Sequence, residues 1–189
     1  WAMLVNRLAD ARFDAENPRT AGRAVASGRL GVRQGWRIAI GAGALFCATA
    51  ALFWPLTGNP WPAMLCVPVL AFVALYSYTK RFTALCHVFL GLALAVSPVA
   101  AGIAVRPESL AEVPGLWWLA GFVALWVAGF DVVYALQDLD FDRARRLRSV
   151  PAALGWRRAV WVSRLLHAGA FACLVLAQAA DDRLGAAFG

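Results

Sequence analysis

Charged residues are scarce in this sequence. Of its 189 residues, 15% are Asp, Glu, Lys or Arg, whereas about a quarter of the residues are charged in soluble globular domains. Apolar residues make up 61% of the chain, and the mean hydropathy is +0.63. This balance excludes an ordinary soluble domain and indicates a protein embedded in a lipid bilayer.

Several motifs that carry common chemistry are also absent. The sequence has no glycine-rich phosphate loop, no Cys/His spacing typical of a metal site and no Ser/His nucleophile set. The few cysteines lie inside apolar runs and form no disulfide framework, so we expect them to pack as small apolar side chains. They are Cys47, Cys66, Cys86 and Cys173.

Long apolar segments dominate what is present. A bilayer core of about 30 Å is crossed by about 20 apolar residues in a helix, and five segments qualify: 36–54, 61–78, 84–105, 115–136 and 159–180. Backbone groups find almost no water inside a bilayer, so these segments must be helical. We predict an all-α, multi-span transmembrane bundle, one domain over residues 1–189. We expect it to be incomplete at both ends, because partial segments precede Asn6 and occupy residues 184–189.

Basic residues are distributed unevenly among the loops. The 18 Lys and Arg outnumber the 11 Asp and Glu, and the formal net charge is +7. In so apolar a chain this charge favours a membrane surface and not nucleic acid as the partner. Five spans place fifteen basic residues on one side and two on the other. The positive-inside rule then puts the Arg-rich loops on the cytoplasmic side of the cytoplasmic (inner) membrane.

The first acidic cluster is Asn6-x3-Asp10-x3-Asp14. Residues four apart on a helix are offset by about 40°, so these three side chains are expected within an arc of about 80°. Like charges at this spacing destabilise a helix by a few tenths of a kcal/mol. The arrangement therefore indicates a compensating cation, with a solvated helix end beside a basic loop as the alternative.

The second cluster is Asp131-x2-Tyr134-x3-Asp138-x3-Asp142. On one continuous helix Asp131, Asp138 and Asp142 share a face with Tyr134, and Asp140 points to the opposite side. Both clusters fall at the cytoplasmic ends of predicted spans, where we expect them to face each other across a cavity mouth. Carboxylates and an amide oxygen are hard ligands that suit Mg²⁺ together with substrate phosphate oxygens.

Two ionisable residues lie deeper in the apolar segments. Asp131 is inside an apolar run, where an ionisable residue is a functional candidate by default. The alternative is an Asp paired with an Arg of a neighbouring helix. His87 stands near the start of another span, and we expect it to pack between helices rather than contact a substrate.

These residues resemble a known family. The segment 6–23 is similar to the first acidic motif of the UbiA superfamily of intramembrane prenyltransferases, N-x3-D-x3-D followed by R-T-x2-R. Residues 131–142 are similar to its second motif, D-x2-Y-x3-D-x3-D. Residues 76–81 resemble its basic turn, and residues 148–155 resemble the stretch after the second motif. The similarity is collinear and covers nearly the whole chain.

There are departures from the family pattern. Arg7 stands where many members have Asp, and Ala24 stands where Pro is common. The family has about nine transmembrane helices. The resemblance therefore implies that this chain lacks the first helix, most of the second and the last ones.

The resemblance implies a prenyltransferase, an enzyme that transfers alkyl or aryl groups other than methyl. It would move a polyprenyl group from polyprenyl diphosphate to an aromatic acid, with Mg²⁺ as the cofactor. The metal ligands implied are Asn6, Asp10, Asp14, Asp138 and Asp142. The diphosphate-binding residues implied are Arg19, Arg23, Lys80 and Arg81. The catalytic residues implied are Asp131, to orient the acceptor or take its ring proton, and Tyr134, to stabilise the allylic cation or hold the diphosphate.

The acceptor is the least determined part of this prediction. Within the family, the motif sequences are most similar to those of 4-hydroxybenzoate polyprenyltransferases and of the branch that makes menaquinone through futalosine. This implies a 4-hydroxybenzoate or dihydroxynaphthoate acceptor in ubiquinone or menaquinone biosynthesis. Family members that prenylate chlorophyllide, haem or glyceryl phosphate share the acidic motifs and remain alternatives. Outside enzymes, the alternatives are a small membrane transporter or channel and a non-catalytic membrane scaffold.

Overall fold

The computed structural model describes residues 1–180, so the predicted partial segment at 184–189 lies outside the described residues. All regular elements in the described part are helices. The chain folds as two compact units, Trp1–Tyr78 and the residues from Thr79 onward. Each unit is described by itself below. That the whole chain forms one domain stays a prediction.

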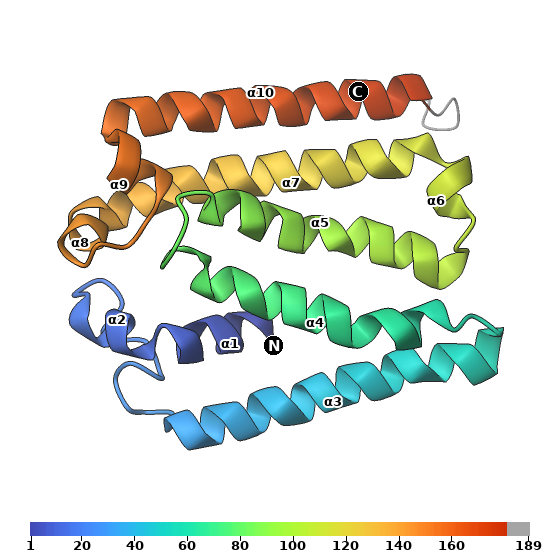
Figure 1. The fold of residues 1–189 in the computed structure, drawn as a ribbon, viewed down its shortest axis with the longest axis horizontal. Helices are drawn as coiled ribbons and strands as arrows, with labels where there is room; N and C mark the ends of the chain where they lie inside the picture. Colours follow the sequence, from blue (N-terminus) through green and yellow to red (C-terminus); the bar gives the residue numbers. More distant parts are fainter. Residues whose placement is uncertain (181–189) are drawn as a thin grey trace. The chain divides into compact units, whose positions relative to one another are not determined.

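The first unit contains α1 (Ala2–Ala9), α2 (Ala11–Glu16), α3 (Val32–Thr57) and α4 (Trp61–Thr79). The short helix α1 packs along the beginning of α3, with Val5, Leu8 and Ala39 in a common apolar core. Gly58 ends α3 in the left-handed conformation, with φ of 75°, which glycine adopts without steric cost. The chain then returns through α4, antiparallel to α3 (Figure 1). As a result α1, α2 and the Arg-rich loop lie at the end where α3 begins.

The second unit is built around one central helix. It contains α5 (Cys86–Val105), α6 (Ser109–Glu112), α7 (Pro114–Ala135), the 3-10 turn η1 (Leu136–Asp138), α8 (Leu139–Ala144), α9 (Val150–Leu154) and α10 (Trp156–Ala180). Helix α7 packs against α5 on one side and α10 on the other (Figure 1). The start of α5, the end of α7 and the start of α10 therefore meet at one end, together with α8 and α9.

Close packing in this unit depends on small residues along the helices. A Cβ atom on Gly91 would lie 2.1 Å from the carbonyl oxygen of Ala124, and one on Gly129 would lie 2.9 Å from the ring of His167. Helices inside membranes commonly associate through such small residues, because apolar burial alone does not drive them together. Across the α7–α10 contact, the Ser163 hydroxyl donates a hydrogen bond to the Gly129 carbonyl at 2.8 Å.

Gly91→Ala is expected to loosen the contact between α5 and α7. The added methyl group meets backbone, which cannot rotate away, so we expect a loss of about 1–3 kcal/mol in the free energy of unfolding. The melting temperature in detergent should fall. The matched control is Gly41→Ala in α3, where nothing lies within 4 Å of the new Cβ. Equal melting temperatures for both variants would contradict the packing described here.

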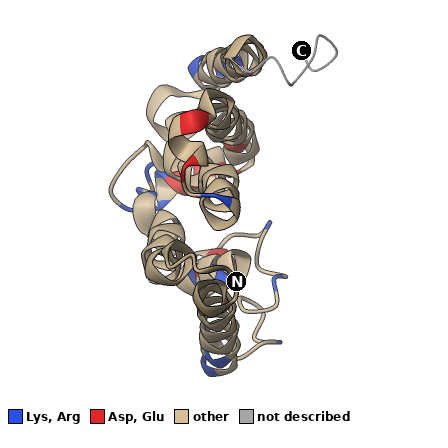
Figure 2. Cartoon of the chain, turned by 90° about the vertical axis from the view of Figure 1, so that its right-hand side faces the viewer, with Lys and Arg blue, Asp and Glu red and all other residues tan. Residues whose placement is uncertain are grey.

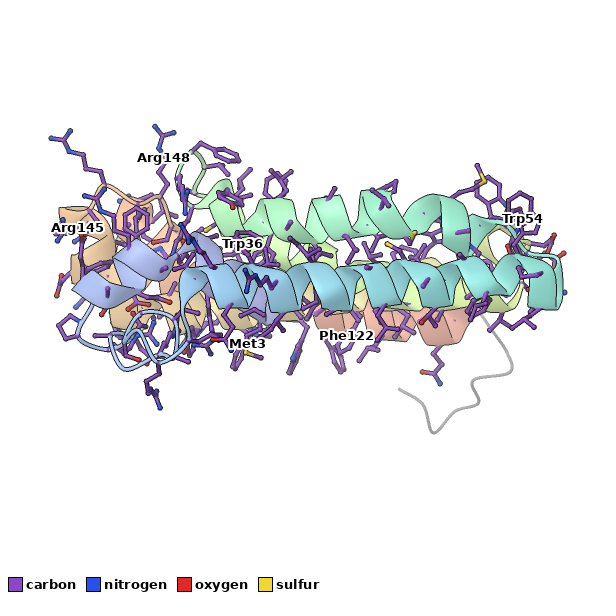
Figure 3. All side chains as sticks on the ribbon, turned by 90° about the horizontal axis from the view of Figure 1, so that it is seen from below. Met3, Trp36, Trp54, Phe122, Arg145 and Arg148 are labelled. Atoms are coloured by element: carbon purple, nitrogen blue, oxygen red, sulfur yellow. The ribbon has the colours of Figure 1, made fainter. Side chains whose placement is uncertain are left out.

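Five helices are long and apolar enough to cross a membrane: Val32–Thr57, Trp61–Thr79, Cys86–Val105, Pro114–Ala144, which takes in η1 and α8, and Trp156–Ala180. Charged residues lie mainly in the loops, in the short helices and in the first turns of α3 and α10 (Figure 2). The apolar residues of the long helices are largely exposed, as expected for surfaces that face lipid. Trp36 and Trp54, both exposed, lie towards opposite ends of α3 (Figure 3). The predicted all-α, multi-span membrane fold is confirmed.

Candidate active site

The first acidic motif spans two short helices. Asp10 ends α1 and precedes α2, with φ −97° and ψ 8°. Its backbone N–H donates to the Asn6 carbonyl at 2.9 Å, and the Asp14 N–H donates to the Asp10 carbonyl at 2.8 Å. These bonds keep the four-residue helical spacing across the distortion. Asp10 and Asp14 are both buried, with 3% and 6% of their surfaces exposed.

The loop after this motif folds back onto it. Helix α2 ends at Glu16, and the next residue, Asn17, is extended because it precedes Pro18. The Thr20 hydroxyl donates to the Asp14 carbonyl at 3.0 Å. Arg23 Nη1 then contacts both carboxylate oxygens of Asp14, at 2.9 and 3.0 Å. Arg23, predicted to bind diphosphate, is therefore paired with a predicted metal ligand. Arg19 is exposed.

The second acidic motif does not form one continuous α-helix, and the prediction that it does is wrong. Helix α7 ends at Ala135, the turn η1 follows over Leu136–Asp138, and α8 begins at Leu139. A 3-10 turn has three residues per turn, so the angular positions expected for a straight α-helix do not apply beyond it. The separation of Asp140 from Asp142 persists nonetheless, because Asp140 is exposed and Asp142 is buried.

Asp142 is held from the loop that follows it. The Ser149 hydroxyl donates a hydrogen bond to Asp142 Oδ2 at 2.9 Å, and Ser149 also caps α9 by accepting from the Ala152 N–H. The charges of Lys80 and Asp138 both act on the Asp142 carboxyl group. Within the second unit, therefore, the end of the second motif and the basic turn lie close together.

The basic turn after α4 is tied to the same loop. The Arg148 backbone N–H donates to the Lys80 carbonyl at 2.6 Å. The Arg148 guanidinium donates to the Phe82 carbonyl at 2.7 Å, and this side chain lies beside the turn that precedes α5 (Figure 3). Lys80 is half-buried, and Arg81 is exposed. The Lys80 backbone is thus fixed next to the residues that hold Asp142.

Asp131 has a partner that the sequence analysis missed. Nδ1 of His87 lies 2.7 Å from Asp131 Oδ2, and Nε2 accepts a hydrogen bond from the Val150 N–H at 3.2 Å. His87 therefore bonds a carboxylate and does more than pack between helices, and the partner of Asp131 is a histidine and not an arginine. The sequence contained one signal for this pairing. Helices α5 and α7 are consecutive spans, so the start of α5, with His87, lies near the end of α7, with Asp131. Ionisable groups inside membranes usually pair with one another.

Tyr134 lies one helical turn after Asp131 on α7, with 42% of its surface exposed. Asp131 belongs to the same helix, and 28% of its side chain is exposed. Both residues of the predicted catalytic pair are thus open enough to meet a ligand. Their catalytic roles stay predictions.

The acidic motifs offer carboxylate oxygens as ligands for a metal ion. Among the residues from 1 to 180, no three His, Cys, Asp or Glu side chains gather closely enough to hold an ion by themselves. Mg²⁺ usually takes only one or two protein carboxylates and completes its shell with water and substrate phosphate. The donor sets fit Mg²⁺ as the partner of a bound phosphate group and do not form an all-protein cage.

Comparison with known proteins identifies the family. The model of the UbiA prenyltransferase family matches residues 1–188, which include both acidic motifs and the basic turn. The chain belongs to the UbiA prenyltransferase family. The family predicted from the motifs is therefore confirmed.

Individual relatives agree with this assignment. A 4-hydroxybenzoate octaprenyltransferase of Shewanella woodyi is 28% identical over 180 residues, which cover 95% of this chain and 60% of the relative. The enzyme of the same name from Nitrosomonas europaea is 35% identical over 152 residues, covering 80% and 49%. The apo structure of a UbiA homolog from Aeropyrum pernix K1 superposes with a TM-score of 0.85 at 36% identity, covering 95% of this chain and 65% of that one. The chain thus spans about half to two thirds of the length of these UbiA relatives.

Proposed function

We propose that the protein transfers a polyprenyl group from polyprenyl diphosphate to an aromatic acid in ubiquinone or menaquinone biosynthesis. The observation that carries this proposal is the family match across residues 1–188, supported by relatives named 4-hydroxybenzoate octaprenyltransferases. We propose an acceptor of the 4-hydroxybenzoate or dihydroxynaphthoate type. The buried carboxylates of both motifs, Asp10, Asp14 and Asp142, support an anionic substrate bound through a cation.

The diphosphate end of the substrate is assigned to the acidic and basic residues. Mg²⁺, when bound, neutralises charge that develops on the diphosphate as its bond to carbon breaks. Its proposed ligands are Asn6, Asp10 and Asp14 in the first motif, and Asp138 and Asp142 in the second. Lys80, Arg19, Arg23 and Arg81 are proposed to contact phosphate oxygens, Arg through paired N–H groups and Lys as a point charge.

The reaction at the acceptor follows from the same chemistry. The bond between the first prenyl carbon and the diphosphate oxygen breaks, and its electron pair leaves with the diphosphate. A ring carbon of the acceptor attacks the allylic cation, and the ring then loses a proton. We assign Asp131 to the acceptor, which it orients or deprotonates, and Tyr134 to the cation. Apolar helices keep water from the cation, and the isoprenoid chain extends into lipid.

We propose the inner membrane as the site of the reaction, with both acidic motifs on its cytoplasmic side. In the first unit the Arg-rich loop lies at the same end as α1 and α2, and in the second unit Arg143 to Arg158 lie at the same end as α8. Such loops remain in the cytoplasm under the positive-inside rule. Protease or labelling access to the 17–31 loop in inverted vesicles, and not in intact cells, is the expected result.

Acceptor competition tests the proposed substrate class. Membranes containing the protein receive a labelled polyprenyl diphosphate with 4-hydroxybenzoate, a dihydroxynaphthoate, or both. We expect label in one aromatic acid, with the better acceptor suppressing use of the other. Binding of the diphosphate without transfer to either acid would move the proposal to another acceptor class. No diphosphate binding would contradict the enzyme assignment itself.

A further inference from the structure

His87 and Asp131 form a pair between α5 and α7, in which the histidine is buried and the aspartate is partly exposed. Their side chains approach to 2.7 Å, and 3% of the His87 side chain is exposed against 28% of that of Asp131. The histidine therefore lies behind the carboxylate and is shielded from whatever meets Asp131. Within the described part of the chain the bond to His87 engages Oδ2, and Oδ1 has no hydrogen bond.

The second ring nitrogen of His87 determines which way this bond runs. The Val150 N–H is always a donor, so Nε2, which accepts from it at 3.2 Å, must carry a lone pair. The ring proton is then on Nδ1. Nδ1–H donates to Asp131 Oδ2, and the imidazole is held in a single tautomer by contacts on both nitrogens.

The Val150 N–H, which donates to Nε2 of His87, is itself fixed in position. Val150 begins α9, and the preceding Ser149 caps that helix and bonds Asp142. One residue earlier, the Arg148 N–H is bonded to the Lys80 carbonyl. The segment Arg148–Val150 therefore contacts Lys80 and Asp142 directly. It reaches Asp131 through His87, which bonds both Val150 and Asp131.

We infer that His87 is a positioning residue for Asp131. It holds one carboxylate oxygen through Nδ1–H and leaves the other open toward an acceptor substrate, with its own orientation fixed by Val150. This inference rests on the proposed function, because it assigns Asp131 to the acceptor. Misplacing a catalytic group by about 1 Å can cost about 100-fold in rate, so loss of the His87 contact should affect turnover more than substrate affinity.

Steady-state kinetics of two variants test this role. His87→Leu removes both hydrogen bonds at similar size, whereas His87→Gln retains one donor and one acceptor. We expect His87→Leu to lower kcat by about 10-fold to 100-fold with the KM for polyprenyl diphosphate unchanged, and His87→Gln to recover most of the rate. His87→Leu combined with Asp131→Asn should be no slower than Asp131→Asn alone, because both changes remove the same contact.

The matched control is His167→Leu in α10. Its Nδ1 approaches the Ser163 carbonyl at 2.9 Å, and its ring packs edge-on against Trp126. We expect this variant to lower the melting temperature and leave kcat unchanged. A normal kcat in folded His87→Leu would overturn the inference. So would a double variant, His87→Leu with Asp131→Asn, whose loss of kcat equals the product of the two single losses.

Nitrogen NMR of histidine-labelled protein gives a reading that does not need activity. The chain has two histidines, so the His167→Leu spectrum assigns the remaining signals to His87. We expect a protonated Nδ1 and an unprotonated Nε2, with the Nδ1 shift changed by Asp131→Asn. The reverse tautomer would overturn the inference. A wild-type protein without transfer activity would contradict the proposed function instead, and the NMR result would still decide whether the pair exists.

Discussion

Asp142→Asn is expected to lower the rate of prenyl transfer by about 100-fold or more. Asp142 is buried in the second acidic motif, its carboxylate is held by the Ser149 hydroxyl, and the charge of Lys80 acts on it. Asparagine keeps an oxygen that can accept from Ser149 but loses the negative charge that we propose binds Mg²⁺. The rate with labelled polyprenyl diphosphate in membranes measures the effect, and the dependence on Mg²⁺ concentration should shift upward.

The matched control is Asp140→Asn, two residues away on the same short helix. Asp140 is exposed, so the same loss of charge should leave the rate nearly unchanged. Both variants lose one negative charge. A difference between their rates therefore reflects the local contacts of Asp142 and not the net charge of the protein. Equal losses at Asp140 and Asp142 would contradict the assignment of metal binding to the buried face.

Asp10→Asn is expected to have an effect of the same size, about 100-fold or more. Asp10 is buried at the junction of α1 and α2, and its backbone bonds to Asn6 and Asp14 do not involve the carboxylate. The substitution keeps these backbone bonds and removes the negative charge of one proposed metal ligand. Transfer rate and melting temperature, measured on the same preparation, separate these two effects.

Glu16→Gln provides the control for the first motif. Glu16 ends α2 and pairs with the exposed Arg12 at 3.4 Å, an arrangement that contributes little to stability. We expect a normal transfer rate. A rate as low as that of Asp10→Asn would mean that acidic charge at this end of the molecule matters in general, and the specific role of Asp10 would be rejected.

The membrane fold could be predicted from the sequence because span length and apolar content are fixed by the bilayer. The local shape of the acidic motifs was harder to predict. Pro18 signals the end of α2, but no proline or glycine marks η1, which divides the second motif after Ala135. The 3-10 turn contradicts one continuous α-helix, and a common face for Asp131, Asp138 and Asp142 stays a prediction.

The contacts of the candidate residues could not be predicted from the sequence. The pairing of Arg23 with Asp14 and of His87 with Asp131 joins residues 9 and 44 positions apart. Helical periodicity relates only residues within a few turns of each other, so it could not predict either pair. Ser149 could not be predicted as a partner of Asp142, because a hydroxyl group has no charge that would mark it in the sequence.

Label transfer with and without free divalent metal tests most directly whether the two acidic motifs act through a bound cation. Membranes containing the protein receive labelled polyprenyl diphosphate and the preferred aromatic acid, first with Mg²⁺ and then with a chelator. We expect labelled aromatic product with Mg²⁺, its loss on chelation and its recovery when Mg²⁺ is restored. Transfer that is unchanged by chelation would contradict the proposed role of the two acidic motifs, and absence of transfer under all conditions would contradict the proposed function.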